Sequence, residues 1–206
     1  LKIVCRKACG FKSHLWHMRI KSSNTAYVIG VAIGDGNLSN SSGRAVRLRV
    51  SCDNKYPNIQ KRITESLKKL LPKNKVNAYY RKVNCTDIYC YSNKLEEILG
   101  WKALEGSKYV QTVRVPRWIF TKEIYIKNCL KGLFETDGSV YKDRVYTYVN
   151  FTTIILPLAE DTINMIKLIG HSPTIQTTLP PNGKRKYTVR VCKRSWDFIK
   201  DVNINK

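Results

Sequence analysis

Two aspartates in this sequence each stand directly before a glycine, at the end of a mostly apolar run. Asp35 follows the run 26–34, and Asp137 follows the run 129–136. Aligning the two aspartates also aligns a glycine five positions before each of them. The sequence therefore predicts an internal duplication, in which each half carries a carboxylate at the end of an apolar helix.

The small residues of these two runs recur at helical spacing. Gly30 and Gly34 lie four residues apart in the first run, and Gly132 and Thr136 repeat that spacing in the second. Small residues on facing stripes allow two helices to approach closely, so parallel packing would bring the two aspartates together. Adjacent carboxylates repel each other unless a cation lies between them. Mg²⁺ is the expected ion because it prefers oxygen ligands and keeps several waters.

The charge of the chain indicates what such a centre would act on. Its 206 residues include 37 Lys and Arg but only 15 Asp and Glu, which gives a formal net charge of +22. That imbalance favours a polyanionic partner, because each neutralised phosphate releases counterions. A metal-dependent phosphodiester hydrolysis fits both observations. A single Asp-Gly pair would more often be an ordinary turn, but two copies in the same context favour a site.

The elements that must position the two aspartates follow the same order in both halves. The hydrophobic pattern predicts for each half a helix, two strands, a helix, two strands and a closing helix. After the first Asp-Gly pair we expect a loop, a strand at 45–51, a helix at 58–71, strands at 76–82 and 87–92, and a helix at 94–99. The second half predicts a strand at 144–152, a helix at 156–169, strands at 174–178 and 187–192, and a helix at 196–202. The corresponding division is a basic arm at 1–23, a first half at 24–108, and a linker and second half at 109–206.

The two runs resemble a known motif. Segments 28–36 (VIGVAIGDG) and 130–138 (LKGLFETDG) are similar to two copies of the LAGLIDADG sequence, and the resemblance extends over roughly residues 24–206. The stretches 115–119, 150–153 and 158–159 also resemble this family, the LAGLIDADG homing endonucleases, in its single-chain, two-motif form. The resemblance implies an α+β fold of pseudo-twofold αββαββα halves, with two antiparallel saddle-shaped sheets in the DNA major groove.

The resemblance also implies a reaction and a ligand set. Asp35 and Asp137 would be the catalytic metal ligands, and the residues before them, Gly34 and Thr136, would offer backbone carbonyls. A monomer would cleave both strands of a long asymmetric DNA target across the minor groove, leaving 3′ overhangs, as in intron homing. Mg²⁺ would be the cofactor, with Mn²⁺ or Ca²⁺ able to take its place.

The sequence departs from the family motif at two positions, Ile33 and Lys131. The sixth motif residue, often acidic, is Ile33 in the first copy and Glu135 in the second, and Lys131 replaces a small second residue. Both final aspartates remain, so the departures indicate that the two helices are not equivalent. The family also places a basic residue near each site, and the motifs do not identify it here.

The polar faces of the predicted strands are the expected DNA-reading surface, because Arg pairs with guanine and Asn or Gln with adenine. The first-half candidates are Arg44, Arg47, Arg49, Asn77, Tyr79 and Arg81. The second-half candidates are Arg144, Tyr146, Tyr148, Gln176, Lys186, Thr188 and Arg190. A solvated sheet face of mixed charge is the alternative, and the scarcity of acidic residues in these strands argues against it. The helix residues Lys61, Lys68 and Lys69 would contact phosphates or simply face solvent.

Other functions remain open on the same scaffold. An RNA maturase that helps an intron fold, or a DNA-binding protein without catalysis, would not need both aspartates. Protein-splicing segments are not visible around the two halves, which makes an intein a weaker interpretation.

The cysteines and the ends of the sequence suggest an intracellular protein, in a prokaryotic cytoplasm or an organelle. The seven cysteines are odd in number and scattered, which argues against a disulfide framework. Cys5, Cys9, His14 and His17 raise the question of zinc, but only four residues separate the two pairs, so a basic arm is favoured. No secretory signal or membrane-spanning run is evident, and no membrane partner is expected.

Overall fold

The computed structural model describes residues 21–41, 43–181 and 183–206, and it consists of two halves with the same order of elements. The first half contains α2 (Ser23–Gly34), β1 (Gly36–Ser39), β2 (Arg47–Asp53), α3 (Pro57–Leu70), β3 (Val76–Tyr80), β4 (Cys85–Tyr91) and α4 (Leu95–Leu99). After a 3₁₀ turn, η1 (Arg117–Thr121), the second half contains α5 (Glu123–Thr136), β5 (Gly138–Asp143), β6 (Tyr146–Thr153), α6 (Leu156–Leu168), β7 (Ser172–Thr178), β8 (Lys186–Cys192) and α7 (Ser195–Val202). The predicted α+β fold of duplicated αββαββα halves is confirmed.

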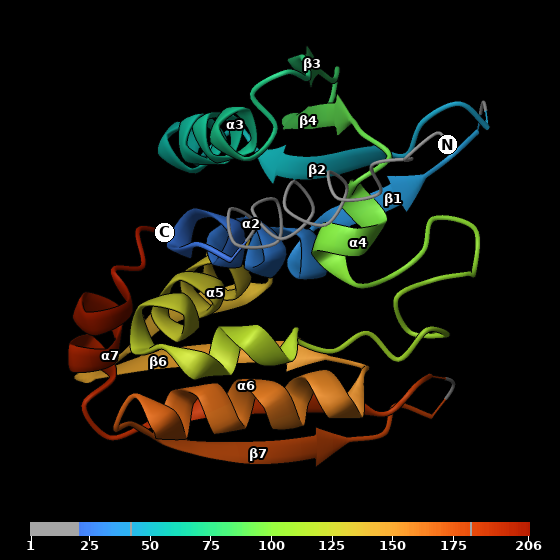
Figure 1. Cartoon of the computed structure of the whole chain (residues 1–206). Helices are drawn as coiled ribbons and strands as arrows, with labels where there is room; N and C mark the ends of the chain where they lie inside the picture. Colours follow the sequence, from blue (N-terminus) through green and yellow to red (C-terminus); the bar gives the residue numbers. More distant parts are fainter. Residues whose placement is uncertain (1–20, 42, 182) are drawn as a thin grey trace, which may run out of the picture.

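The two sheets have equivalent topologies. Their strand orders are β1-β2-β4-β3 and β5-β6-β8-β7, and all neighbouring strands are antiparallel. The helices α2 and α5 lie side by side between the halves, with one sheet above this pair and the other below it (Figure 1). The hydrophobic cores of the two halves therefore meet along the pair of helices α2 and α5.

The close contact of α2 and α5 depends on glycine. A Cβ added to Gly30 would lie 2.2 Å from the carbonyl oxygen of Cys129, and one added to Gly132 would lie 2.4 Å from that of Tyr27. The two contacts join equivalent positions of the two motifs. The helices are therefore parallel and are related by a pseudo-twofold axis. Helix α2 is buried on all sides from Thr25 to Gly34, which explains its apolar sequence.

Each sheet has a buried and an outward face, as its alternating strands predict. In β2 the side chains of Leu48 and Val50 are fully buried, whereas Arg47 and Arg49 are only half-buried on the other face. Helix α3 covers the inner face of the first sheet, where its buried Ile63 contacts the same apolar layer. Helix α6 covers the second sheet in the same way (Figure 1).

The structure corrects the expected path after each motif. A strand, rather than the predicted loop, begins at Gly36, and β5 begins equivalently at Gly138. A Cβ at Gly36 would lie 2.4 Å from the carbonyl oxygen of Ala32, and one at Gly138 2.5 Å from that of Phe134. Glycine thus permits the chain to leave the helix and enter the sheet without an intervening loop.

The second half differs from the prediction at its first hairpin. Arg144 has a φ of 53° and lies in the turn between β5 and β6, so the strand expected from residue 144 starts at Tyr146. Val145 lies in the same turn, and its side chain is 88% exposed.

Two further predictions concern the cysteines and the membrane. The cysteines within the described residues are all free, and three of the five are buried. The proposed cluster of Cys5, Cys9, His14 and His17 lies outside the described residues. No helix in the described part of the chain has the length and apolar character needed to cross a membrane.

Candidate active site

The two motif aspartates meet where α2 and α5 end. Asp35 and Asp137 are the C-cap residues of the two helices, with backbone N–H groups donating to Ala32 and Leu133. Their carboxyl groups lie close enough to affect each other's ionisation, and both residues are exposed. The structure therefore brings together the two carboxylates that the sequence analysis selected.

The surroundings of this pair favour its protonated form in the absence of a cation. Loss of solvation, and then the negative charge of Asp137, raise the pKa of Asp35 to about 6. Loss of solvation also raises the pKa of Asp137. Lys108 and Lys206 act in the opposite direction on both carboxyl groups but do not cancel the shift. The pair thus carries an electrostatic cost that a bound divalent cation would relieve.

A lysine reaches the end of α2 from the connection between the halves. The Nζ of Lys108 donates to the carbonyl oxygen of Gly34, to that of Ile33 at 2.5 Å, and to that of Ala32 at 3.4 Å. Desolvation lowers the pKa of Lys108, although both motif aspartates favour its charged form. The ammonium group therefore lies at one of the two carbonyls expected to bind metal.

A second lysine has the equivalent position at the end of α5. The Nζ of Lys206 donates to the carbonyl oxygens of Thr136 at 2.7 Å and Gly138 at 2.5 Å. Lys108 and Lys206 occupy the place expected for the basic residues that the motifs did not identify, and each lies in an irregular segment after the closing helix of its half. The repeated order of elements is the one signal that could have found them.

The oxygen atoms at this centre suit a hard divalent cation. Asp35 and Asp137 would supply carboxylates, and Gly34 and Thr136 would supply carbonyls. A cavity of about 70 Å³ lies beside them, lined in part by Asp35, Thr136 and Lys206. Within the described residues no group of three or more His, Cys, Asp or Glu side chains could hold a metal. A site with so few protein carboxylates fits Mg²⁺, which keeps waters and binds substrate phosphates.

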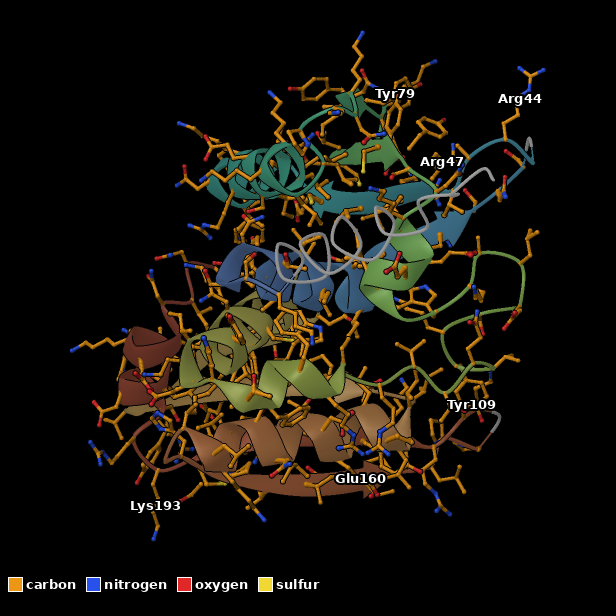
Figure 2. All side chains as sticks on the ribbon, viewed as in Figure 1. Arg44, Arg47, Tyr79, Tyr109, Glu160 and Lys193 are labelled. Atoms are coloured by element: carbon orange, nitrogen blue, oxygen red, sulfur yellow. The ribbon has the colours of Figure 1, made fainter. Side chains whose placement is uncertain are left out.

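The sheet residues predicted to read DNA share the outward faces of the two sheets. In the first sheet, Arg49 pairs with Tyr89 and Tyr89 with Asn77, on the face opposite Val50. Figure 2 shows Arg47 and Tyr79 on this sheet and Arg44 at the β1–β2 loop beyond it. In the second sheet, Gln176 pairs with Thr188 across adjacent strands. The same face carries Tyr146, Tyr148, Lys186 and Arg190, whereas Arg144 lies in the β5–β6 turn.

Several of these side chains are already oriented by neighbours. Arg190 donates through Nε to Asn150 at 3.2 Å, and its guanidinium lies 5.3 Å from the ring centre of Tyr148. Arg47 donates through Nε to the hydroxyl of Ser39 at 3.1 Å. Such contacts restrict the arginines before any ligand binds, which favours specific recognition.

Arg81 differs from the other arginines of the first sheet. It lies beyond the end of β3 and donates to the carboxylate of Asp87 at 2.8 Å through Nε and at 2.5 Å through Nη2. Asp87 also accepts from the hydroxyl of Ser51 at 2.7 Å. Part of the Arg81 guanidinium is thus engaged within the protein, so it has fewer donors for a base than the prediction assumed.

The lysines of α3 do not lie with the DNA-reading candidates. Lys61, Lys68 and Lys69 are exposed on a helix that covers the inner face of the first sheet. Of the two alternatives that the sequence left open, this position favours solvated charge over contact with a duplex on the outward face.

Comparison with known proteins agrees with the geometry. Residues 125–196 match the family model of the LAGLIDADG-like domain. The same order of elements and the same aspartate position occur in the first half. The second half of the chain thus matches the LAGLIDADG-like domain, and the first half repeats its order of elements. The resemblance found in the sequence is therefore confirmed, as is the fold class.

Solved structures share the fold of this chain over most of its length. The homing endonuclease I-DmoI in complex with DNA and Mn has a TM-score of 0.66 and 17% identity, covering 89% of this chain and 98% of that one. Mesophilic variants of I-DmoI give the same TM-score and identity, with 89% and 96% covered. The N-terminal LAGLIDADG domain of DUF199/WhiA has a TM-score of 0.59 and 14% identity, covering 99% and 98%.

Curated relatives by sequence are DNA polymerases. The chain is 27% identical over 186 residues to a DNA polymerase of Thermococcus sp. (strain GE8), and 28% identical over 161 residues to one of Thermococcus hydrothermalis. The matches cover 85% and 75% of this chain, but the chain spans only 10% and 9% of these relatives. So small a share gives no reason to assign polymerase activity to this chain.

Proposed function

We propose that this protein is a site-specific endonuclease that hydrolyses both strands of double-stranded DNA with a divalent metal, preferably Mg²⁺. The observation that carries the proposal is the joint position of Asp35 and Asp137, with a lysine at the carbonyl oxygen preceding each of them. A structural helix pair would need neither the two adjacent carboxylates nor the two partly desolvated lysines.

The aspartates and the lysines of the centre have different roles in this proposal. A bound divalent metal would activate water and stabilise the leaving oxygen of the phosphodiester. Asp35 and Asp137 would hold it through their carboxylates, and a nearby cation would favour the ionised form of both groups. The ammonium groups of Lys108 and Lys206 lie within the field of both aspartates and can stabilise negative charge on the reacting phosphate.

The outward faces of the sheets provide the DNA-binding surface. The net charge of +22 supports strong, salt-dependent attraction to the phosphate backbone. The two faces carry different residues, because Arg49 in the first half has Asn150 as its counterpart in the second. A duplex bound by one chain across both sheets would therefore present a long asymmetric target. We propose that cleavage occurs across the minor groove and leaves 3′ overhangs.

The structural relatives support DNA and metal binding and also define the alternative. I-DmoI has been crystallised with its target DNA and with Mn, Ca or Mg. The DUF199/WhiA domain shares the same fold with a TM-score of 0.59. The fold alone therefore does not distinguish a protein that cleaves DNA from one that only binds it. A DNA-binding protein without catalysis is thus the second candidate function.

Selection from a library of randomised DNA duplexes tests the proposal directly. The purified protein should enrich one asymmetric sequence and cut it on both strands with Mg²⁺, and EDTA should abolish the cut. Enrichment without cleavage would support the non-catalytic alternative. Preferential binding of structured intron RNA over any duplex would instead indicate a maturase.

A further inference from the structure

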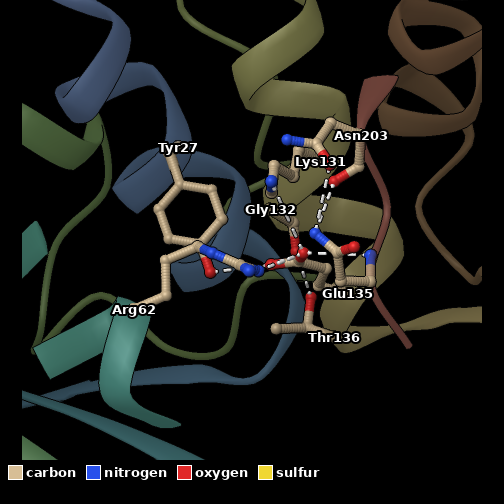
Figure 3. A network of polar contacts seen from close by, with 8 residues as sticks. Tyr27, Arg62, Lys131, Gly132, Glu135, Thr136 and Asn203 are labelled. Atoms are coloured by element: carbon tan, nitrogen blue, oxygen red, sulfur yellow. Dashed lines mark hydrogen bonds and ion pairs between the residues drawn. The ribbon is translucent and has the colours of Figure 1, made fainter. Parts of the chain in front are cut away.

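Glu135 is a fully buried carboxylate next to the active site. Its side chain has no exposed surface, and it lies two residues before a motif aspartate. Its Oε2 accepts a hydrogen bond of 2.8 Å from the Tyr27 hydroxyl, and its Oε1 accepts one from Arg62. The Oε1 atom also lies 3.9 Å from the Nζ of Lys131 and accepts from the backbone N–H of Asn205 at 3.4 Å (Figure 3).

Every neighbour in this network is a donor. The Tyr27 hydroxyl, the Arg62 guanidinium and the backbone N–H of Asn205 donate to one carboxylate, and the Lys131 ammonium lies 3.9 Å from it. A carboxylate offers these neighbours only acceptor oxygens, whereas an amide side chain would turn two N–H donors toward them. The network therefore favours Glu over Gln at this position.

The network joins elements that are far apart in the sequence. Tyr27 is on α2 and Arg62 on α3 of the first half, whereas Lys131 and Glu135 are on α5. Asn205 belongs to the segment 203–206 that follows α7. The carboxylate thus fastens this last segment to the motif helices of both halves.

The segment 203–206 carries the second lysine of the active site. Asn203, with a φ of 56°, ends α7 and turns the chain, and the side chain of Ile204 is buried. The next residue, Asn205, binds Glu135, and the residue after it, Lys206, reaches the carbonyl oxygens at the end of α5. Asn205 is therefore the direct link between the buried carboxylate and the lysine.

The first half holds its lysine by other means. Its motif has Ile33 where the second has Glu135. The loop that carries Lys108 is held instead by Gln111, whose amide donates to the carbonyl oxygens of Lys102 and Gly106, both at 2.8 Å. Loss of Glu135 should consequently affect one of the two lysines and spare the other.

We propose that Glu135 is the positioning residue that fixes the segment 203–206 and so places Lys206 at the end of α5, where it serves cleavage of one DNA strand while Lys108, at the end of α2, serves the other. The catalytic part of this inference rests on the proposed endonuclease function. The positioning part does not, and it can be measured on the protein without DNA.

Hydrogen exchange tests the positioning. In Glu135→Gln, amide exchange in a peptide covering residues 199–206 should accelerate at least about tenfold, because the amide keeps only one acceptor oxygen for several donors and loses the charge, which weakens its bond to the N–H of Asn205. Met165→Ala is the matched control, since it removes a fully buried side chain from α6, on the far side of the second half. Unchanged exchange at 199–206 in Glu135→Gln, or the same acceleration in Met165→Ala, would overturn the proposal whether or not the protein cuts DNA.

Strand-resolved cleavage tests the consequence. With each strand of the selected duplex labelled separately, Glu135→Gln should slow cleavage of one strand at least about tenfold relative to the other. Lys206→Met should slow cleavage of the same strand, and Lys108→Met should slow cleavage of the opposite strand. Adding Glu135→Gln to Lys206→Met should slow cleavage little further. Equal slowing of both strands by Glu135→Gln would contradict the role assigned to it. If the unaltered protein cuts no duplex, the endonuclease proposal fails, and the exchange measurement still decides the positioning.

Discussion

The backbone of Gly30 lies directly against that of Gly132: a Cβ on Gly132 would come within 3.0 Å of the carbonyl carbon of Gly30. This contact sets the distance between α2 and α5, and so the distance between the aspartates at their ends. Backbone atoms cannot move aside as a flexible side chain can. The active-site geometry is therefore determined several residues away from the chemistry.

A methyl group at this contact should separate the helices. Gly132→Ala would place its Cβ 2.4 Å from the carbonyl oxygen of Tyr27, so we expect the free energy of unfolding to fall by about 1–3 kcal/mol or more. Urea denaturation of the metal-free protein measures this. Lys68→Ala, on the exposed face of α3, is the control and should change the free energy of unfolding by less than about 0.5 kcal/mol. Equal stability of the two variants would refute the close packing.

The motif aspartates should separate binding from cleavage. Asp35→Asn or Asp137→Asn should keep affinity for the selected duplex, because the sheet faces are untouched. Each should reduce cleavage with Mg²⁺ by at least about a hundredfold, since a metal ligand is lost. Filter binding in Ca²⁺ and cleavage assays in Mg²⁺ distinguish the two effects. Full cleavage by either variant would contradict the assignment of Asp35 and Asp137 as metal ligands.

The pH dependence of stability should report the carboxyl pair. The pKa of Asp35 is about 6 in the folded protein, against an ordinary value of 3.8. Between these values the folded state binds the additional proton, so this group makes the free energy of unfolding decrease as pH rises to about 6 and level off above it. Urea denaturation in EDTA, compared between the unaltered protein and Asp35→Asn, isolates the contribution. The difference in the free energy of unfolding between the two proteins could instead stay constant between pH 3.8 and about 6, or change in the opposite direction. Either result would contradict the raised pKa of Asp35.

The arginines of the first sheet should determine sequence preference. Arg47→Ala should cost about 1–3 kcal/mol of affinity for the selected duplex and relax the preference at one base pair, if the guanidinium reads a guanine. Lys61→Ala on α3 is the comparison, and we expect it to alter neither quantity. Binding measured on every single-base variant of the target provides the test, and a uniform loss on all of them would assign Arg47 to the phosphate backbone instead.

Much of the architecture could be predicted because the duplication repeats strong local signals. The alternation of Leu48 and Val50 with Arg47 and Arg49 determines which face of β2 is buried, and the structure agrees. The start of β1 could not be predicted, because a short strand beginning at Gly36 has little hydrophobic pattern. It depends on the hydrogen-bonded pairing of β1 with β2, which is a tertiary contact.

The active site was predictable only where a motif marks it. Asp35 and Asp137 follow from the repeated Asp-Gly pairs, and the structure places them in contact. Lys108 and Lys206 lie in irregular segments, and their importance arises from where the folded chain brings them. Glu135 looked like a variation within the motif, and its role depends on donors that α3 and the segment 203–206 contribute only after folding.

Divalent metal binding tests the central claim most directly. Free Mn²⁺ can be measured by electron paramagnetic resonance as the protein, bound to its selected duplex, is added at neutral pH. The unaltered protein should remove Mn²⁺ from solution in a stoichiometric amount, and the double variant Asp35→Asn and Asp137→Asn should remove none beyond the duplex alone. Equal Mn²⁺ binding by the two proteins would show that the carboxylates at the ends of α2 and α5 do not hold the metal.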